Sequence, residues 1–169
     1  ITGIYGTNSS SLLTNVSITN NTGEGVHFDG IGNAVLSNVT IAENTSNALY
    51  ASNTDAQADF SVLVKNSIIF GTVVNPLSQA SAQYSLIEND AIPNNISANG
   101  ASATDIFTDI TSGDFTLKGT SPAVNTGSNV LFVGLNTNSK DLAGNARLNG
   151  TAIDLGAYEF FITHDQNGI

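Results

Sequence analysis

The sequence predicts an all-β fold in which short strands stack as the coils of a solenoid, followed by an irregular C-terminal cap. Three observations support this fold class: one segment recurs several times, each copy alternates apolar and small polar residues, and turn-forming residues separate the copies. The composition alone, with 22 Asn, 18 Ser, 18 Thr and 16 Gly among 169 residues, also allows a disordered linker. The repeats favour the β fold, and 40% hydrophobic residues are enough for a core.

The repeated segment first occurs at positions 13–21 and returns at positions 36–44, an offset of 23. A third copy lies at positions 64–70, at an offset of 28 from the second. A fainter fourth lies at positions 82–87, at an offset of 18 from the third. We attribute the longest offset to an insertion between Asp55 and Asp59. The copies therefore predict at least four structural units of one kind.

Each copy has the two-residue period of a strand with one buried face. Val16 and Ile18 point one way, and Val39 and Ile41 repeat them one copy later. A unit this short cannot bury its apolar face alone, so the copies should stack at strand spacing with parallel sheets along the sides. The predicted interior stack consists of Val16, Ile18, Val39, Ile41 and Ile69, extended by Ile87.

An asparagine recurs at the equivalent turn position of three copies, as Asn15, Asn38 and Asn66. Two interpretations stay open. The side chains could form an amide ladder in which each bonds to the next coil, or asparagine could simply mark turns, because it tolerates left-handed backbone geometry.

Units with these offsets and this pattern resemble the coils of the right-handed parallel β-helix of the pectin-lyase-like superfamily. Leucine-rich repeats would require several regularly spaced leucines per unit, which are missing. Ice-binding solenoids would require a strict threonine array, and Thr14, Thr19 and Thr40 have no match in the third copy. The resemblance implies a right-handed parallel β-helix solenoid over residues 1–104.

From Asp105 onward the repeat fades and a different pattern begins. Its marks are Asp114-Phe115-Thr116-Leu117, Ser121-Pro122-Ala123-Val124-Asn125-Thr126-Gly127, Asp141-Leu142-Ala143-Gly144-Asn145-Ala146-Arg147 and Ile153-Asp154-Leu155-Gly156-Ala157-Tyr158-Glu159-Phe160. In this order they resemble the C-terminal region of bacterial exported β-helix proteins of the choice-of-anchor Q type. Ala146 stands where proline is common in that family, and Asn125 where aspartate is common. The resemblance implies a secreted or cell-surface protein, mostly without an assigned activity.

Residues 105–169 are interpreted as a capping region on the last coils, because the open end of a solenoid exposes apolar side chains and unpaired backbone. The apolar residues expected to close this end are Phe115, Leu117, Val124, Leu155, Tyr158 and Phe160. Arg147, the only arginine, is close in sequence to three acids, Asp141, Asp154 and Glu159. We predict a buried Arg–carboxylate pair that holds the final loop, with a ligand or metal role for the carboxylates as the alternative.

Charge and cysteine content exclude several classes of function. Four Lys and Arg stand against 14 Asp and Glu, a formal charge of −10, which argues against nucleic acid and anionic lipid surfaces as partners and makes polyanionic polysaccharide an awkward ligand. No apolar run is long enough to insert into a membrane. The absence of Cys excludes disulfides and thiolate chemistry.

The sequence offers no convergent catalytic set. A polysaccharide lyase needs a cation beside the substrate, and the repeats offer only Lys65 and His27. A glycosidase needs paired carboxylates, whereas Asp29 and His27 share a strand whose equivalent positions one coil later are Tyr50 and Ser52. His27 is therefore interpreted as an exposed strand residue, and no catalytic residue is predicted.

Cofactor binding is not predicted beyond weak calcium candidates. Asp55 and Asp59 lie in one acid-containing segment, and Asp105 and Asp109 lie in another. Neither segment has the spacing of an EF-hand or of a nonapeptide calcium repeat.

Two functional hypotheses follow. The first is a non-catalytic structural or adhesive module of a larger bacterial protein, secreted or on the cell surface. Its partners would be upstream β-helix coils of the same chain and polysaccharide or host cell-surface glycans. The alternative is the non-catalytic tail of a polysaccharide lyase or glycoside hydrolase with active coils upstream. Because the sequence starts at Ile1 and shows no signal peptide, we expect a piece excised from a longer protein.

Overall fold

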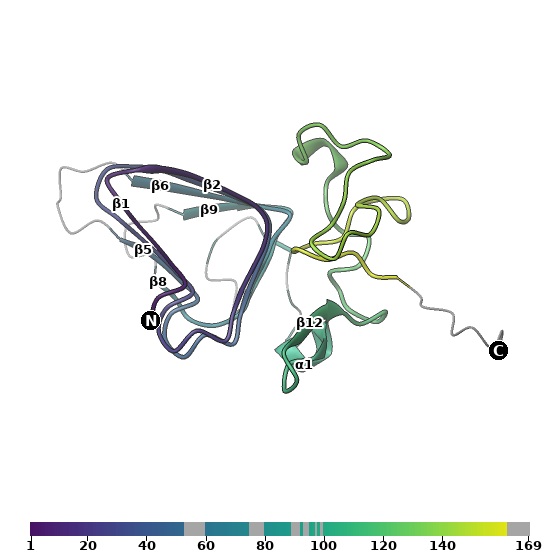
Figure 1. Cartoon of the computed structure of the whole chain (residues 1–169), viewed down its shortest axis with the longest axis horizontal. Coiled ribbons are helices and arrows are strands. Elements are labelled where there is room, and N and C mark those ends of the chain that lie inside the picture. Colours follow the sequence, from purple (N-terminus) through teal and green to yellow (C-terminus); the bar gives the residue numbers. More distant parts are fainter. Residues whose placement is uncertain are drawn as a thin grey trace.

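A computed structural model describes residues 1–52, 60–74, 80–88, 92, 95–96, 98 and 100–161. The protein is mostly β, with parallel sheets, one of which is strongly curled. Figure 1 shows successive passes of the N-terminal half lying one over another as a triangle, with the C-terminal region beside them. We call each pass a coil: the first is residues 1–22, the second 23–45, the third 46–71 and the fourth 72–88.

Two parallel sheets form the sides of the coils. One has the order β1 (Ile4–Thr7), β3 (Val26–Asp29), β5 (Leu49–Ser52) and β8 (Val73–Val74). In the other, β4 (Gly32–Ala42) pairs with β2 (Ser10–Thr19), β6 (Phe60–Lys65) and β7 (Ile68–Ile69), and β9 (Ala80–Gln83) and β10 (Leu86–Ile87) follow β6 and β7. Long β2 and β4 bend around one corner of the triangle, which curls this sheet.

The strand register matches the predicted repeat offsets. Val16 pairs with Val39 and Ile18 with Ile41, the Ile41 partner in the next coil is Ile69, and Ile69 pairs with Ile87. All six lie in or against one apolar cluster inside the coils. The predicted interior stack is therefore confirmed.

The corners of the coils require residues that accept a left-handed backbone. At one corner Asn15, Asn38, Asn66 and Tyr84 have φ values of 54°, 56°, 46° and 48°. The next corner repeats the positive φ at Asn20, Glu43 and Gly71. Asparagine and glycine adopt this region at least cost, which explains why they occupy most of these corner positions.

The C-terminal region contains little regular structure. It begins with a short helix, α1 (Ala103–Ile106), which leads into an antiparallel pair formed by β11 (Phe107–Asp109) and β12 (Asp114–Leu117). A single 3₁₀ turn, η2, follows at Asn129–Leu131, and loops make up the rest as far as residue 161. None of the helices in the described part of the chain has the length and hydropathy of a membrane span.

The C-terminal region packs against the side of the coils, which corrects the expectation that it closes their end. The six apolar residues predicted to close the end join a second cluster, together with Ala42, Ile68, Phe70 and Leu86 of the coils. These four alternate with the interior residues Ile41, Ile69 and Ile87 and so point outward. The outer face of this side is apolar, and the C-terminal region removes it from water.

Candidate functional site

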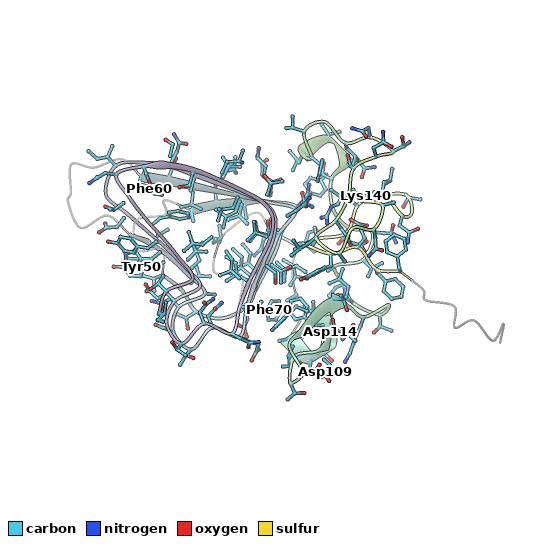
Figure 2. The ribbon with its side chains drawn as sticks, in the orientation of Figure 1. Tyr50, Phe60, Phe70, Asp109, Asp114 and Lys140 are labelled. Atoms are coloured by element: carbon cyan, nitrogen blue, oxygen red, sulfur yellow. The ribbon has the colours of Figure 1, made fainter. Side chains whose placement is uncertain are left out.

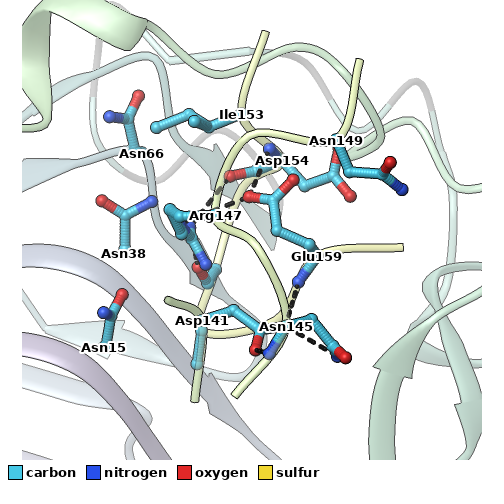
Figure 3. Close-up of polar contacts among 12 residues, drawn as sticks. Asn15, Asn38, Asn66, Asp141, Asn145, Arg147, Asn149, Ile153, Asp154 and Glu159 are labelled. Atoms are coloured by element: carbon cyan, nitrogen blue, oxygen red, sulfur yellow. Dashed lines mark hydrogen bonds and ion pairs between the residues drawn. The ribbon is translucent and has the colours of Figure 1, made fainter. Parts of the chain in front are cut away.

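Arg147 is buried at the centre of the C-terminal region (Figure 3). Its Nη2 donates hydrogen bonds to the carbonyl oxygens of Asp154 (3.2 Å) and Gly156 (2.6 Å). Its Nε lies 3.3 Å from Glu159 Oε1, and its Cζ lies 5.9 Å from the centre of the Phe132 ring. The side chain therefore joins the loop that carries it to the segment 153–160.

The three predicted acids surround Arg147, and each binds backbone. Asp141 Oδ2 accepts a hydrogen bond from the Glu159 amide (2.9 Å), and Glu159 Oε1 accepts one from the Asp154 amide (3.0 Å). Asp154 Oδ1 accepts the Asn125 amide at 2.6 Å. All three acidic residues are at most 5% exposed. The cluster thus ties together the loops at residues 125, 141–147 and 153–160.

Burial perturbs the titration of this cluster. It raises the pKa of Glu159 to about 8, although Arg147 opposes the shift, and it raises the pKa of Asp154. It also lowers the pKa of Arg147, which the carboxyls counteract. Glu159 Oε2 and the Arg147 Nε and Nη1 atoms have no hydrogen-bond partner among the described residues. A proton on Glu159 reduces the negative charge that three buried acids would otherwise place beside one arginine.

The Arg147 cluster, defined as Asp141, Arg147, Asp154 and Glu159, is enclosed by protein. Because its carboxyls are buried and bonded to backbone amides, they are not presented to a polysaccharide. The arrangement fixes these loops to one another through hydrogen bonds to their backbones.

The row of corner asparagines faces the C-terminal region and does not form the amide ladder considered from the sequence (Figure 3). Asn15 Nδ2 donates to the Lys140 carbonyl (2.9 Å). Asn66 Nδ2 donates to the Ser128 carbonyl (3.0 Å), and its Oδ1 accepts the Ser128 amide (2.8 Å). Asn38, between them, accepts a long hydrogen bond from Ser37 (3.3 Å). The side chains of Asn15 and Asn66 anchor the C-terminal loops to the coils.

An asparagine pair between coils does occur at a different corner. Asn44 Oδ1 accepts hydrogen bonds from both the backbone amide (3.0 Å) and Nδ2 (2.9 Å) of Asn21. Asn44 Nδ2 in turn donates to the Ile18 carbonyl (3.0 Å) of the first coil. Asn21 and Asn44 are separated by the repeat offset of 23. The repeat therefore did contain the signal of an asparagine pair between coils, but at this corner and not at the corner of Asn15 and Asn38.

Gly156, in the segment 153–160, allows the C-terminal region to approach the coils closely. Gly156 has φ +83°, its amide donates to the Asn66 carbonyl (2.8 Å), and an added Cβ would lie 2.5 Å from Thr40 Oγ1. The Ala157 amide donates to the same Thr40 hydroxyl (3.0 Å). The Gly156-Ala157 dipeptide therefore lies directly on the outer face of β4.

The calcium candidates do not converge where the structure describes them. Asp105 accepts hydrogen bonds from Ser102 at the start of α1, and Asp109 accepts them from Thr111 and Ser112 in the turn after β11. Asp55 and Asp59 lie outside the described residues. Within the described ranges, no group of three His, Asp or Glu side chains could hold a metal ion.

His27 lies in an aromatic row that sequence reasoning missed. Its ring stacks on Tyr50 of the next coil, with centroids 4.3 Å apart and planes 20° apart, and lies 4.8 Å from the Tyr5 ring of the preceding coil. The register pairs Tyr5 with His27 and His27 with Tyr50. We call these three residues the Tyr–His row. The missed signal was the offset of 22 that separates Tyr5 from His27.

An acidic residue fixes the imidazole in this row. Glu24 Oε2 lies 2.6 Å from His27 Nδ1, and Glu24 Oε1 accepts a hydrogen bond from Asn47 Nδ2 (2.8 Å). Although burial opposes it, these hydrogen bonds hold the pKa of Glu24 below its ordinary value. His27 is half-buried, and not simply an exposed strand residue, because its ring faces are covered by neighbouring coils.

Lys65, the other cation of the repeats, lies at the end of β6. It lines a shallow groove of about 350 Å³ between the outer face of the curled sheet and the loop after η2. Its apolar lining comes from Leu12, Val35, Leu131, Phe132 and Val133. No ion pair of Lys65 is present in the described part of the chain.

The outer edge of the first coil is uncovered. β1 and β2 each pair on one side only, and the interior residues Ile4, Leu13 and Val16 are only partly buried. A hollow of about 310 Å³ opens there between Ile4, Val16 and Ile18. No charged side chain precedes Glu24, although the whole chain carries −10. Edge strands that must stay free of partners usually carry charges, and this edge carries none.

Comparison with protein-family models, with curated proteins and with solved structures gives no match for this chain.

Proposed function

We propose that this chain is a non-catalytic structural or adhesive module of a larger, secreted or cell-surface protein built as a right-handed parallel β-helix. The observation that carries the proposal is the uncovered edge of the first coil. Its unpaired strands, half-exposed core residues and lack of charge are the properties of a coil in the middle of a stack. Another coil in parallel register would bury this edge in the way the second coil buries the first.

Hydrogen bonding supports a coil with the same repeat as the occupant. Asn44 Oδ1 receives two hydrogen bonds from Asn21 of the preceding coil. Asn21 donates from both its backbone amide and its Nδ2, and its side-chain Oδ1 has no hydrogen-bond partner in the described part of the chain. An asparagine from one further coil would complete the same pair. The resemblance of residues 105–160 to exported β-helix proteins supports the same assignment and an extracellular location.

The proposal is tested by adding a coil. A copy of residues 23–45, the second coil, is fused before Ile1. We expect the melting temperature to rise by more than roughly 4 °C, because each kcal/mol corresponds to about 2–4 °C in a chain of this size. The amides of β1 and β2 should also become protected from hydrogen exchange.

The matched control is the same fusion with Val39→Asp and Ile41→Asp in the added copy, which cannot pack on the first coil. A melting temperature no higher than that of this control would contradict the proposal. So would release of reducing sugar or unsaturated uronate from polysaccharides by the purified chain, which would make it an enzyme.

A further inference from the structure

We infer that the Tyr–His row binds an uncharged oligosaccharide chain that runs along the stack of coils. The row lies on the outer face of β1, β3 and β5, on the opposite side of the coils from the C-terminal region, as the position of Tyr50 shows (Figure 2). This inference deepens the proposed function, on which it rests, by naming the contact site and the class of glycan.

The row presents a line of polar groups on a rigid apolar support. The stacked rings of Tyr5, His27 and Tyr50 hold one another in place, and Glu24 fixes Nδ1 of the imidazole. The two tyrosine hydroxyls and His27 Nε2 have no hydrogen-bond partner among the described residues. Three groups that can exchange hydrogen bonds with a ligand therefore lie in line, one on each coil.

The spacing of this line suits a sugar polymer. Coils stacked at strand separation are ~4.8 Å apart, and a pyranose ring has a comparable length. Successive sugars of an extended chain can therefore each meet the equivalent residue of the next coil. The Tyr5 side chain is 61% exposed, and its hydroxyl has no partner in the described part of the chain, so it is accessible to a sugar hydroxyl beside the row.

The charges around the row favour an uncharged glycan. Glu24 lies directly beside His27, and Asp29 lies two residues further along the same face of β3. The strands β1, β3 and β5 contain no Lys or Arg. Uronic acid or sulfated chains would meet repulsion there, increased by the overall charge of −10.

A proline-rich peptide, the other common ligand of aromatic rows, fits less well. Such peptides insert prolines between separated aromatic side chains that line a groove. Here the centroids of neighbouring rings are 4.3 and 4.8 Å apart, so the rings are in contact and leave no space between them.

The test titrates the intact chain with neutral hexasaccharides (cellohexaose, mannohexaose and chitohexaose) and with hexagalacturonate, followed by calorimetry and by the His27 ring resonances in NMR. We expect at least one neutral probe to bind and to shift these resonances, and the acid probe not to. Tyr5→Ala and Tyr50→Ala should each raise Kd about tenfold, the loss of one aromatic anchor. Circular dichroism establishes that each variant is folded.

The control is Tyr84→Asn, which removes an accessible tyrosine outside the row and installs the residue that other coils carry at this corner. It should leave binding unchanged. The inference is overturned if no neutral probe binds at millimolar concentration, if hexagalacturonate binds more tightly, or if only a decaproline peptide shifts the His27 resonances. A fusion that still stabilises the first coil would show that the module proposal survives such a failure.

Discussion

The outer face of one side of the coils changes from polar to apolar along the stack. In the register, one outward row runs through Ser17, Thr40, Ile68 and Leu86. Ser17 in the first coil is partly exposed, whereas Ile68 and Leu86 are fully buried beneath the C-terminal region. The neighbouring inward row stays apolar in all four coils, as Ile18, Ile41, Ile69 and Ile87. The change is therefore confined to the outward residues, which differ according to what covers each coil.

The same comparison separates two kinds of uncovered surface. At the first coil, the interior residues Ile4, Leu13 and Val16 are only partly buried while the outward residues Ser17 and Thr19 are polar, so what is uncovered there is the edge facing along the stack. At the third coil, the interior residue Ile69 is fully buried, and the outward residues Ile68 and Phe70 are apolar, so they are removed from water only if another part of the chain covers them. The C-terminal region covers them, and the Arg147 cluster holds it in shape.

The largest expected effect comes from the Arg147 cluster. Arg147→Ala leaves the buried Glu159 carboxyl and the Gly156 carbonyl without their partner, which should cost roughly 3–5 kcal/mol of unfolding free energy. Urea denaturation measures it. The control is Lys140→Ala, at an exposed cation whose side chain has no partner in the described part of the chain. It should hardly change the unfolding free energy. If both variants lost the same unfolding free energy, the Arg147 cluster would not stabilise the C-terminal region.

The next effect tests the outward row directly. Ile68→Ala removes apolar contacts beneath the C-terminal region and should destabilise by roughly 2–4 kcal/mol, because it leaves a cavity. Ser17→Ala, at the equivalent position of the first coil, should change stability by less than about 0.5 kcal/mol. If the two substitutions had similar effects, the C-terminal region would not rest on this side in solution.

The repeat made most of the fold predictable. Because coils stack in register, offsets read from Asn15, Asn38 and Asn66 gave the strand pairing directly, and alternation at Val16 and Ile18 gave the interior. Arg147 could be assigned to its acids because it is the only arginine and the three carboxyls lie close to it in the sequence.

What could not be predicted depended on surfaces and not on the repeat. The prediction did not say which side of the coils the C-terminal region covers. The sequence did contain a signal: Ile68-Ile69-Phe70 is apolar on both faces of its strand, whereas the first coil has Ser17-Ile18-Thr19, with polar residues on the outer face. The Tyr–His row was not predicted because its first offset is 22 and not 23, and because the aromatic residue changes from tyrosine to histidine and back to tyrosine along the row. The corner asparagines turned outward to the C-terminal loops, which repeat periodicity cannot reveal.

The effect that is smallest per step of the experiment, at most about 1.4 kcal/mol for each pH unit, is a pH dependence. It sharpens the contrast between the two regions, because the first coil has no acidic or basic side chain and the Arg147 cluster has four. Burial raises the pKa of Glu159 from 4.5 to about 8, so between these values the folded protein holds a proton that the unfolded chain has released. The stability that this proton contributes should therefore be fully present below pH 4.5, fall as the pH rises, and be lost above pH 8.

One proton limits the slope to about 1.4 kcal/mol per pH unit. Denaturation midpoints measured from pH 5 to pH 9 give this slope, since titration of the ordinary surface acids is nearly complete in that range. Glu159→Gln is the matched variant, because the amide resembles the protonated carboxyl and cannot ionise. Its stability should change much less with pH, the remainder coming from Asp154, whose pKa burial also raises. A wild-type protein whose stability is constant or increases over this range would mean that Glu159 is ionised beside Arg147, with the ion pair outweighing the cost of burial.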